Sequence, residues 1–287
     1  MKFVARRDAR AGSVTLYAIV LLPMAILPRQ ASTQQTTSRD TGNVHITADV
    51  PLLRPRDLVA VAGLAGAVAA MMPADERIER AFQRSSLQTS SQLSKFSGAA
   101  GALGDPGSVV VSAALYFSGL GLHSRKLAAL GMHTGESVVL GGLIAEGLKG
   151  EVGRARPKIS PDDSHIFRTG RGFSSDDYGS FPSAETTAAF AMMSTLSRGI
   201  NRDWPGHSRW VTPVAYTSAT LVAASRVYKN EHWASDVVAA SGLGTFSGIF
   251  VDRFNRRYPD NIFERVFLPE SVVPLHHGFV AAWTRAF

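Results

Sequence analysis

Apolar residues gather into segments of helical length along most of this chain, and short polar or charged stretches separate these segments. The first, Asp57 to Met72, is a run of Ala, Val, Leu and Gly behind a candidate helix cap at Asp57. After Pro73 the pattern becomes amphipathic, with Ile78 and Phe82 among the candidate core residues. Further helices are predicted at 107–122, 124–149, 186–198, 210–225 and 232–254. The pattern therefore predicts an all-α protein, a helical bundle with about six core helices.

The apolar segments are short compared with the thickness of a bilayer. None exceeds about 17 residues without a charge, whereas a membrane-spanning helix needs about 20 apolar residues. The chain is 45% hydrophobic and 18% charged, which is low in apolar content for a protein with many spans. We therefore expect the body of the protein to be soluble, with at most a peripheral contact with a membrane.

The N-terminus has a different pattern. Basic residues from Lys2 to Arg10 precede an apolar run from Ala11 to Pro28, as in a signal peptide or a single anchor. We therefore expect an exported protein, either periplasmic or membrane-anchored with its domain outside the cytoplasm. Residues 31–43 are polar and threonine-rich, which favours a flexible tether. The predicted division is 1–31 for the signal or anchor, 32–56 for a linker, 57–257 for the helical domain and 258–287 for a C-terminal tail.

The most informative polar stretch is SRVYKNEHWASD, from Ser225 to Asp236. A histidine attacks phosphorus through a neutral ring nitrogen, so its other nitrogen needs an acceptor that fixes the tautomer. If a helix begins at about His232, Asp236 lies one turn further along the same face, within reach of the ring. Arg226 can offer a planar fork of donors to a phosphate. The same spacing is common on solvated helix faces, so this stretch alone leaves both interpretations open.

Two other segments favour the phosphate interpretation. Lys149 and Arg156 stand seven residues apart in KGEVGRARP, about two helical turns, which sets both cations on one face before Pro157. In FPSAET, Ser183 stands at a predicted helix start, where free N–H groups and the helix dipole favour an anion.

These three segments, in this order, resemble a known signature. Lys-x6-Arg-Pro, Pro-Ser-x-x and Ser-Arg-x5-His-x3-Asp are similar to the motifs of the type-2 phosphatidic acid phosphatase and vanadium haloperoxidase superfamily. The resemblance covers Lys149 to Asp236 by motif. It implies that His232 is the nucleophile that forms a phosphohistidine and that Asp236 orients it. It implies the following phosphate ligands: Lys149, Arg156, Ser183 and Arg226.

The second motif departs from the family pattern. That pattern ends in Gly-His, whose histidine protonates the leaving group, whereas this chain has Ala184 and Glu185. A carboxylic acid can act as a general acid when its pKa is raised, and burial beside a bound phosphate dianion would raise the pKa of Glu185. The alternative is that Glu185 only complements the helix dipole in a protein that has lost catalysis.

Composition restricts the partners. The net charge of +7 favours anionic ligands, such as phosphorylated small molecules or lipid phosphates. We find no nucleic-acid-binding module in the sequence. The loop between Pro157 and Pro182 is polar, and a substrate-gating role is expected for it. Asp162, Asp163 and His165 in this loop could hold a metal, but their spacing without a third convergent ligand is a weak signal. We therefore assign no metal ligands and no cofactor.

Three functions remain. The first is a metal-independent hydrolase of phosphoric esters or pyrophosphates, with lipid phosphates among its candidate substrates. The second is a phosphate or lipid-phosphate binding protein of the same fold that has lost turnover, for which Glu185 is the main support. The third is a vanadate-dependent haloperoxidase with His232 as the vanadium ligand, and the missing histidine at position 185 counts against it.

Overall fold

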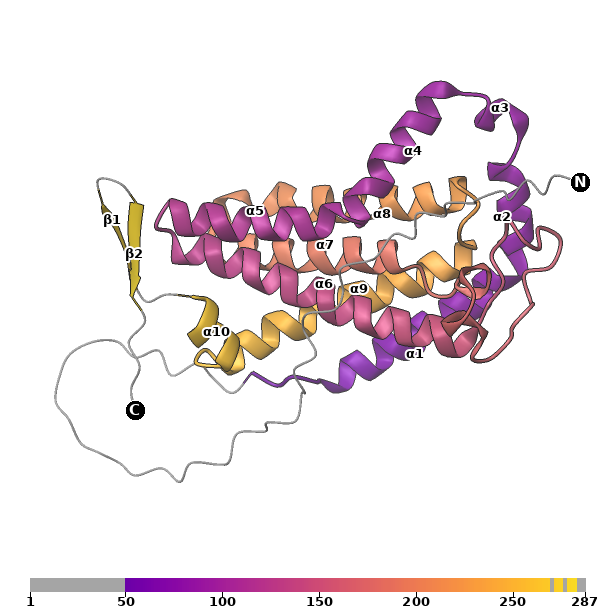
Figure 1. The fold of residues 1–287 in the computed structure, drawn as a ribbon. Helices are drawn as coiled ribbons and strands as arrows, with labels where there is room; N and C mark the ends of the chain where they lie inside the picture. Colours follow the sequence, from indigo (N-terminus) through magenta and orange to yellow (C-terminus); the bar gives the residue numbers. More distant parts are fainter. Residues whose placement is uncertain (1–49, 269–270, 276–277, 283–287) are drawn as a thin grey trace, which may run out of the picture. The chain divides into compact units, whose positions relative to one another are not determined.

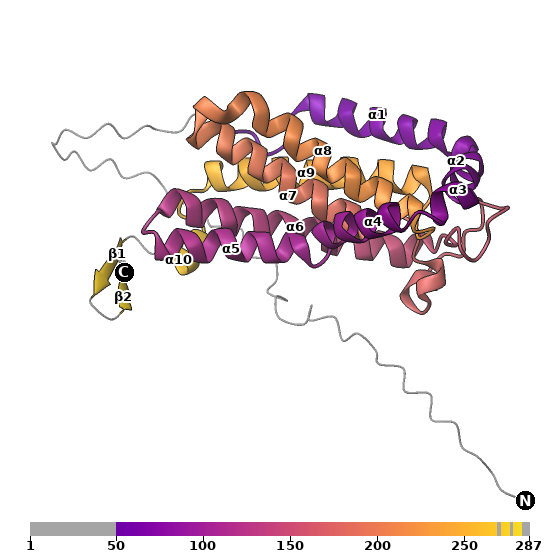
Figure 2. The same ribbon diagram turned by 90° about the horizontal axis from the view of Figure 1, so that it is seen from above.

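The computed structural model describes residues 50–268, 271–275 and 278–282. The predicted signal or anchor and most of the predicted linker lie outside these residues. The long helices are α1 (Pro55–Met71), α5 (Gly107–Gly121), α6 (Arg125–Val152), α7 (Ala184–Asp203), α8 (Ser208–Tyr228) and α9 (Ala234–Arg257). Helices α5 to α9 lie side by side, and successive helices run in opposite directions (Figures 1 and 2). The prediction of an all-α bundle is therefore confirmed.

Short elements join α1 to α5. They are η1 (Met72–Ala74), α2 (Asp75–Phe82), α3 (Ser85–Gln88) and α4 (Ser91–Gly104). The amphipathic stretch after Pro73 thus divides into several helices. Helix α2 contacts α8 and α9, and α4 contacts α7 and α8. Two short helices outside this group, η2 (Arg171–Phe173) and η3 (Asp176–Tyr178), belong to the loop between α6 and α7, and η4 (Pro205–His207) precedes α8.

The C-terminal segment predicted as a tail contains regular structure. Helix α10 (Ile262–Phe267) begins behind Asn261, whose side-chain oxygen accepts hydrogen bonds from the N–H groups of Phe263 and Glu264. Strands β1 (Ser271–Leu275) and β2 (Gly278–Ala282) then pair antiparallel, with Val273 opposite Val280.

Helix α7 is packed against α6, α8 and α9 and forms the centre of the bundle. Small residues permit this close packing. At Gly244 of α9 an added Cβ would lie 2.3 Å from the carbonyl oxygen of Thr187, so only glycine allows the two backbones to approach. The buried core beside α7 is made of Val138, Ala188, Ala189, Phe190, Met192, Ala219, Val222 and Ala223.

Within the described residues, three helical stretches are long and apolar enough to cross a membrane by length and composition. They are Pro55–Phe82, Arg125–Val152 and Ala234–Arg257. This differs from the expectation that the apolar segments are too short, because isolated charges and glycines interrupt the apolar pattern without ending the helix. Helix α1 buries none of its residues, and its Leu58 and Val59 are 73% and 72% exposed.

Candidate functional site

The three motif segments lie at one end of the bundle, where α6 and α8 end and α7 and α9 begin. Helix α6 carries Lys149 in its last turn, and its C-cap is Gly153, which has a φ of 58°. A Cβ there would lie 1.8 Å from the carbonyl oxygen of Arg168, so this left-handed position requires glycine. The chain then continues extended, and Arg154 forms an antiparallel bridge with Phe167 of the following loop.

Helix α7 begins directly after Ser183, which is the N-cap as the sequence predicted. The Ser183 Oγ accepts a hydrogen bond from the Thr186 N–H group at 3.3 Å, and the side chain is fully buried. Glu185 therefore lies in the first turn of α7, where the helix dipole favours a negative charge.

His232 precedes α9 and is almost completely buried. Its Nδ1 lies 2.6 Å from the carbonyl oxygen of Ser180. Because a carbonyl oxygen only accepts, Nδ1 must carry a proton in this contact. The Nε2 atom is buried, has no hydrogen-bond partner among the described residues, and lies 3.4 Å from Oε2 of Glu185. The ring thus has its reactive nitrogen directed at the segment that carries Glu185.

Asp236 does not orient the His232 ring directly, which corrects the predicted contact. The helix begins at Ala234, two residues later than expected, so Asp236 is its third residue and not a partner one turn from His232. Its Oδ2 accepts hydrogen bonds from the Trp233 N–H group at 2.9 Å and from the Ser180 hydroxyl at 2.5 Å. Asp236 therefore holds the residue whose carbonyl orients the ring.

The Glu185 carboxylate makes the contacts that the resemblance implies for a substrate phosphate. Its Oε1 lies 2.9 Å from Nη2 of Arg226, and its Oε2 lies close to His232 and 3.5 Å from the Ser183 hydroxyl. Burial raises the pKa of Glu185, but His232 and then Arg226 outweigh it and hold this pKa well below its usual range. The carboxylate is therefore ionised in this state. This lowering of the pKa is opposite to the rise expected beside a bound phosphate dianion.

The predicted phosphate-binding cations Lys149 and Arg226 each share a carboxylate with Arg156, which indicates that the three cations lie near one another. Lys149 and Arg156 both act on Asp176, and Arg156 and Arg226 both act on Glu231. Burial raises the pKa of each of these carboxyls. For Asp176 the charge and hydrogen bond of Arg156, together with Lys149 and Lys158, outweigh burial. For Glu231 Lys158, Arg156 and Arg226 together do so, and both pKa values are lowered.

Each of these cations already has a carboxylate partner. Lys149 Nζ donates to Glu146 at 2.7 Å, and the two Nη atoms of Arg156 contact Asp176 at 2.6 Å and Glu231 at 2.8 Å. The partners are accessible to solvent, with Glu146 59% and Asp176 75% exposed. An incoming anion would compete with these carboxylates.

Comparison with known proteins identifies the family that carries these motifs. Residues 130–258 match the PAP2 superfamily, and this segment contains all three motifs. The segment belongs to the PAP2 superfamily. The resemblance seen in the sequence is thereby confirmed.

Two relatives extend the comparison. Lipid A 1-phosphatase from Porphyromonas gingivalis is 29% identical over 120 residues, which are 42% of this chain and 21% of that protein. The crystal structure of a transmembrane PAP2-type phosphatidylglycerolphosphate phosphatase from Bacillus subtilis is similar with a TM-score of 0.53 at 20% identity. This match covers 73% of the present chain and all of the other, and it supports the fold.

Sequence reasoning missed a second carboxyl beside the PAP2 motifs. Asp105, at the end of α4, is exposed, and the charges of Glu185, Arg226 and Lys149 all reach it. Burial of part of the group, and then the charge of Glu185, raise the pKa of Asp105. Two carboxyls of one site thus have pKa values shifted in opposite directions, which is an arrangement typical of acid and base pairs. The only sequence signal was the place of Asp105 directly before Pro106 and the helix predicted at 107–122.

Sequence reasoning also missed the surroundings of Arg154, which is 1% exposed. All five of its N–H donors are used: by the Ser164 carbonyl twice, by Ser235 Oγ, by Asp236 Oδ1 at 2.6 Å and by Asp75 Oδ2 at 2.8 Å. No pattern in the sequence connects Asp75 with Arg154, which follows it by 79 positions.

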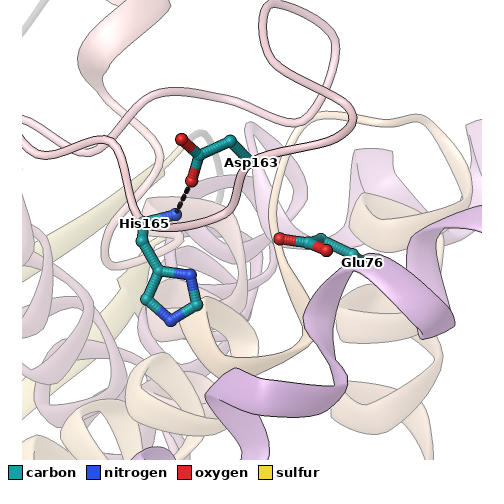
Figure 3. Close-up of side chains that lie close together, drawn as sticks. All are labelled: Glu76, Asp163 and His165. Carbon is teal, nitrogen blue, oxygen red and sulfur yellow. Dashed lines mark hydrogen bonds between the residues drawn. The ribbon is translucent and has the colours of Figure 1, made fainter.

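The loop between α6 and α7 holds a cluster of candidate cation ligands. Asp163 and His165 lie near Glu76 of α2, with one ligand atom of each within 4.8 Å of the others (Figure 3). Glu76 is the third convergent group that the sequence did not reveal, whereas Asp162 is outside the cluster. Asp163 and His165 are exposed, and Glu76 also accepts hydrogen bonds from Ser164. Nothing beyond proximity indicates a metal ion here.

Proposed function

We propose that this protein is a metal-independent lipid-phosphate phosphohydrolase that acts through a phosphohistidine on His232. One observation carries the proposal. The buried His232 Nε2 and the buried Arg226 Nε have no hydrogen-bond partner within the described ranges, and both residues lie beside the Glu185 carboxylate, Arg226 through its Nη2. Buried polar atoms normally have partners, so two unpaired nitrogens, one of them in a guanidinium group that binds anions, favour a missing anionic ligand.

Binding of a phosphate would begin as an exchange of anions. The phosphate replaces Glu185 at Arg226, and it competes with the carboxylates that hold Lys149 and Arg156. Planar guanidinium groups suit this exchange, because they bind either a carboxylate or a phosphate through two parallel hydrogen bonds.

Glu185 then supplies the acid that the second motif lacks. In this mechanism one proton belongs to the pair of His232 and Glu185, and Glu185 Oε2, 3.4 Å from Nε2, is the acceptor within reach. When the phosphate takes Arg226 from Glu185, the carboxylate loses the charge that favours its ionised form, so the proton passes from Nε2 to Glu185. The Nε2 lone pair attacks phosphorus, the bond from phosphorus to the leaving oxygen breaks, and Glu185 donates its proton to that oxygen.

The second half of the reaction reverses these roles. Glu185 accepts a proton from water, the water oxygen attacks phosphorus, the Nε2–phosphorus bond breaks and phosphate leaves. The pair of Glu185 and His232 must hold one proton between them for the first half to begin, and Glu185 must be ionised for the second half. Activity should therefore follow a bell-shaped pH profile that belongs to the pair and not to either residue.

A lipid substrate and a membrane location are supported independently. The relatives named above act, by their names, on lipid A and on phosphatidylglycerolphosphate. Helices α1 and α5 also present large apolar side chains to the outside, among them Leu58, Val59, Val110 and Phe117, each more than half exposed. We propose that the apolar stretches found above span the membrane, in place of the peripheral contact expected from sequence.

Charge favours one orientation in the membrane. The end of the bundle opposite His232 carries an excess of basic residues over acidic ones. The basic residues at that end are Arg54, Arg56, Arg125, Lys126, Arg198, Arg202, Arg209, Arg253, Arg256, Arg257 and Arg265, and the acidic ones are Asp57, Asp203, Asp252, Asp260 and Glu264. Basic residues next to membrane spans are retained in the cytoplasm. The end with His232 would then face the other side, as expected for an exported domain.

The test is phosphate release by the purified full chain in detergent or lipid vesicles with a chelator present. The substrates are phosphatidic acid, phosphatidylglycerolphosphate and p-nitrophenyl phosphate. His232→Ala is the variant expected to be inactive. His123→Asn is the matched control, because His123 is exposed and lies just after the C-terminal end of α5. Substrate labelled with ³²P should leave an acid-labile, alkali-stable label that is absent from His232→Ala. Phosphate binding without release or label would favour the binding protein without turnover.

A further inference from the structure

Asp75 begins α2, distant along the sequence from every motif, and has no exposed surface. Both of its carboxylate oxygens are used. Oδ1 accepts the N–H group of Ser235 at 2.8 Å, and Oδ2 accepts Nη2 of Arg154 at 2.8 Å and also the Ser235 hydroxyl. This buried carboxylate holds its donor groups in place, because leaving any of these donors unpaired in the interior costs free energy.

The groups that Asp75 binds are the first turn of α9 and the arginine beside it. Asp236 accepts from the other Nη atom of Arg154 and from the Trp233 N–H group. Two carboxylates thus hold the N-terminal N–H groups of α9, where the helix dipole favours them, and Arg154 joins the two carboxylates. His232 is the residue directly before this anchored turn.

The same network fixes the acceptor of the His232 ring. Ser180 donates its N–H group to the Arg154 carbonyl at 3.1 Å and its hydroxyl to Asp236 Oδ2 at 2.5 Å. Its carbonyl oxygen receives Nδ1–H of His232 at 2.6 Å. The backbone of His232 and the acceptor of its ring are therefore both tied to Arg154 and Asp236.

We infer that Asp75 is a positioning residue for His232, acting through Arg154, Asp236 and Ser180. It keeps Nδ1 protonated and Nε2 directed at the phosphorus. The kinetic consequence of this role rests on the proposed hydrolase function, whereas the effect on the ring does not. Asp75 does not touch the reacting atoms, so its removal should slow the chemical step and leave substrate binding nearly unchanged.

Asp75→Asn tests this inference, with Asp57→Asn as the matched control. Asp57 is also a carboxylate paired with a buried arginine, Arg253, but at the opposite end of α9. Both variants lose one charge from such a pair. We expect Asp75→Asn to lower kcat about 10- to 100-fold, as loss of an outer partner of a positioned histidine does, with KM changed less than about threefold. Asp57→Asn should leave kcat and KM at their original values.

A spectroscopic measurement detects the Nδ1–H hydrogen bond of the His232 ring and does not require turnover. In full-length protein labelled with ¹⁵N-histidine, Nδ1–H of His232 should give a downfield, slowly exchanging signal, assigned by its loss in His232→Ala. Asp75→Asn should shift or broaden this signal, and Asp57→Asn should not. An unchanged signal in Asp75→Asn would overturn the inference. If the protein releases no phosphate from any substrate, the proposed function fails while this signal still decides the inference.

Should Asp75→Asn fail to fold, Ser180→Ala examines the same network with a smaller change. It removes the hydroxyl that binds Asp236 and keeps the carbonyl that binds His232. The Nδ1–H signal should move in the same way, and kcat should fall while KM is preserved. A signal and a kcat equal to those of the unchanged protein would again contradict the positioning role.

Discussion

Two arginines that stand two residues apart serve this site in opposite ways. Arg154 is 1% exposed and Arg156 is 6% exposed, so both are buried. The carboxylates that bind Arg154, Asp75 and Asp236, have no exposed surface. Arg156 is bound by Asp176, which is 75% exposed, and by Glu231.

The difference lies in what can replace each partner. Water or a phosphate can take the place of Asp176 beside Arg156, because that carboxylate can turn into solvent and remain hydrated. Nothing can replace Asp75 beside Arg154 without leaving a buried charge unpaired. Buried partners therefore make a fixed frame for His232, whereas the exposed partner of Arg156 can exchange with another anion, such as the proposed phosphate.

The largest expected effect is on folding, from replacing each arginine by methionine. Arg154→Met leaves two buried carboxylates without a counter-ion, and breaking a buried pair in this way costs about 3–5 kcal/mol. Arg156→Met leaves carboxylates that water can reach, so we expect a loss of at most about 1 kcal/mol, together with weaker phosphate binding. Thermal unfolding of both variants in the same detergent measures the difference. Equal melting temperatures would remove the distinction between fixed frame and open site.

The next effect concerns Glu185, the exchangeable carboxylate nearest the chemistry. Glu185→Gln keeps the shape of the side chain and cannot donate a proton as an acid does, so hydrolysis of alkyl phosphates should fall about 10²- to 10⁴-fold. Nitrophenolate leaves without an acid, so p-nitrophenyl phosphate should be affected far less. The same comparison on Asp105→Asn identifies the acid, because only one of the two variants should discriminate between the leaving groups. Equal losses on both substrates in Glu185→Gln would show that Glu185 is not the acid.

Much of this arrangement could be predicted from local pattern. Apolar periodicity gave the helices, Ser183 was recognised as a helix start, and the three motifs identified the family. The contact between Asp236 and His232 was misjudged because the helix begins at Ala234, and a shift of two residues turns a neighbour on one face into a capping residue. Asp75 could not be found, because its role depends on packing between segments that are distant in the chain.

The smallest expected effect tests the difference between Arg154 and Arg156 most directly, because it changes only one exposed carboxylate. Asp176→Asn removes a competitor for Arg156, so inorganic phosphate should inhibit the proposed hydrolysis more strongly, by about 2- to 5-fold in its inhibition constant, as the modest strength of exposed ion pairs implies. The pKa of Asp176 lies below its ordinary value, so the carboxyl stays ionised from about pH 5 to 8 and the gain should be constant over that range. High salt should reduce the gain, because exposed charges are screened.

The neighbouring residue provides a control for this last effect. Asp177→Asn removes the same charge from the same loop, but the Asp177 side chain makes no ion pair with any residue that the structure describes. Only its backbone carbonyl takes part, accepting the N–H group of Arg156. Phosphate inhibition in Asp177→Asn should therefore change much less than in Asp176→Asn. Equal gains in the two variants would mean that a general reduction of negative charge strengthens phosphate binding, and that the carboxylate at Arg156 does not act as an exchangeable partner.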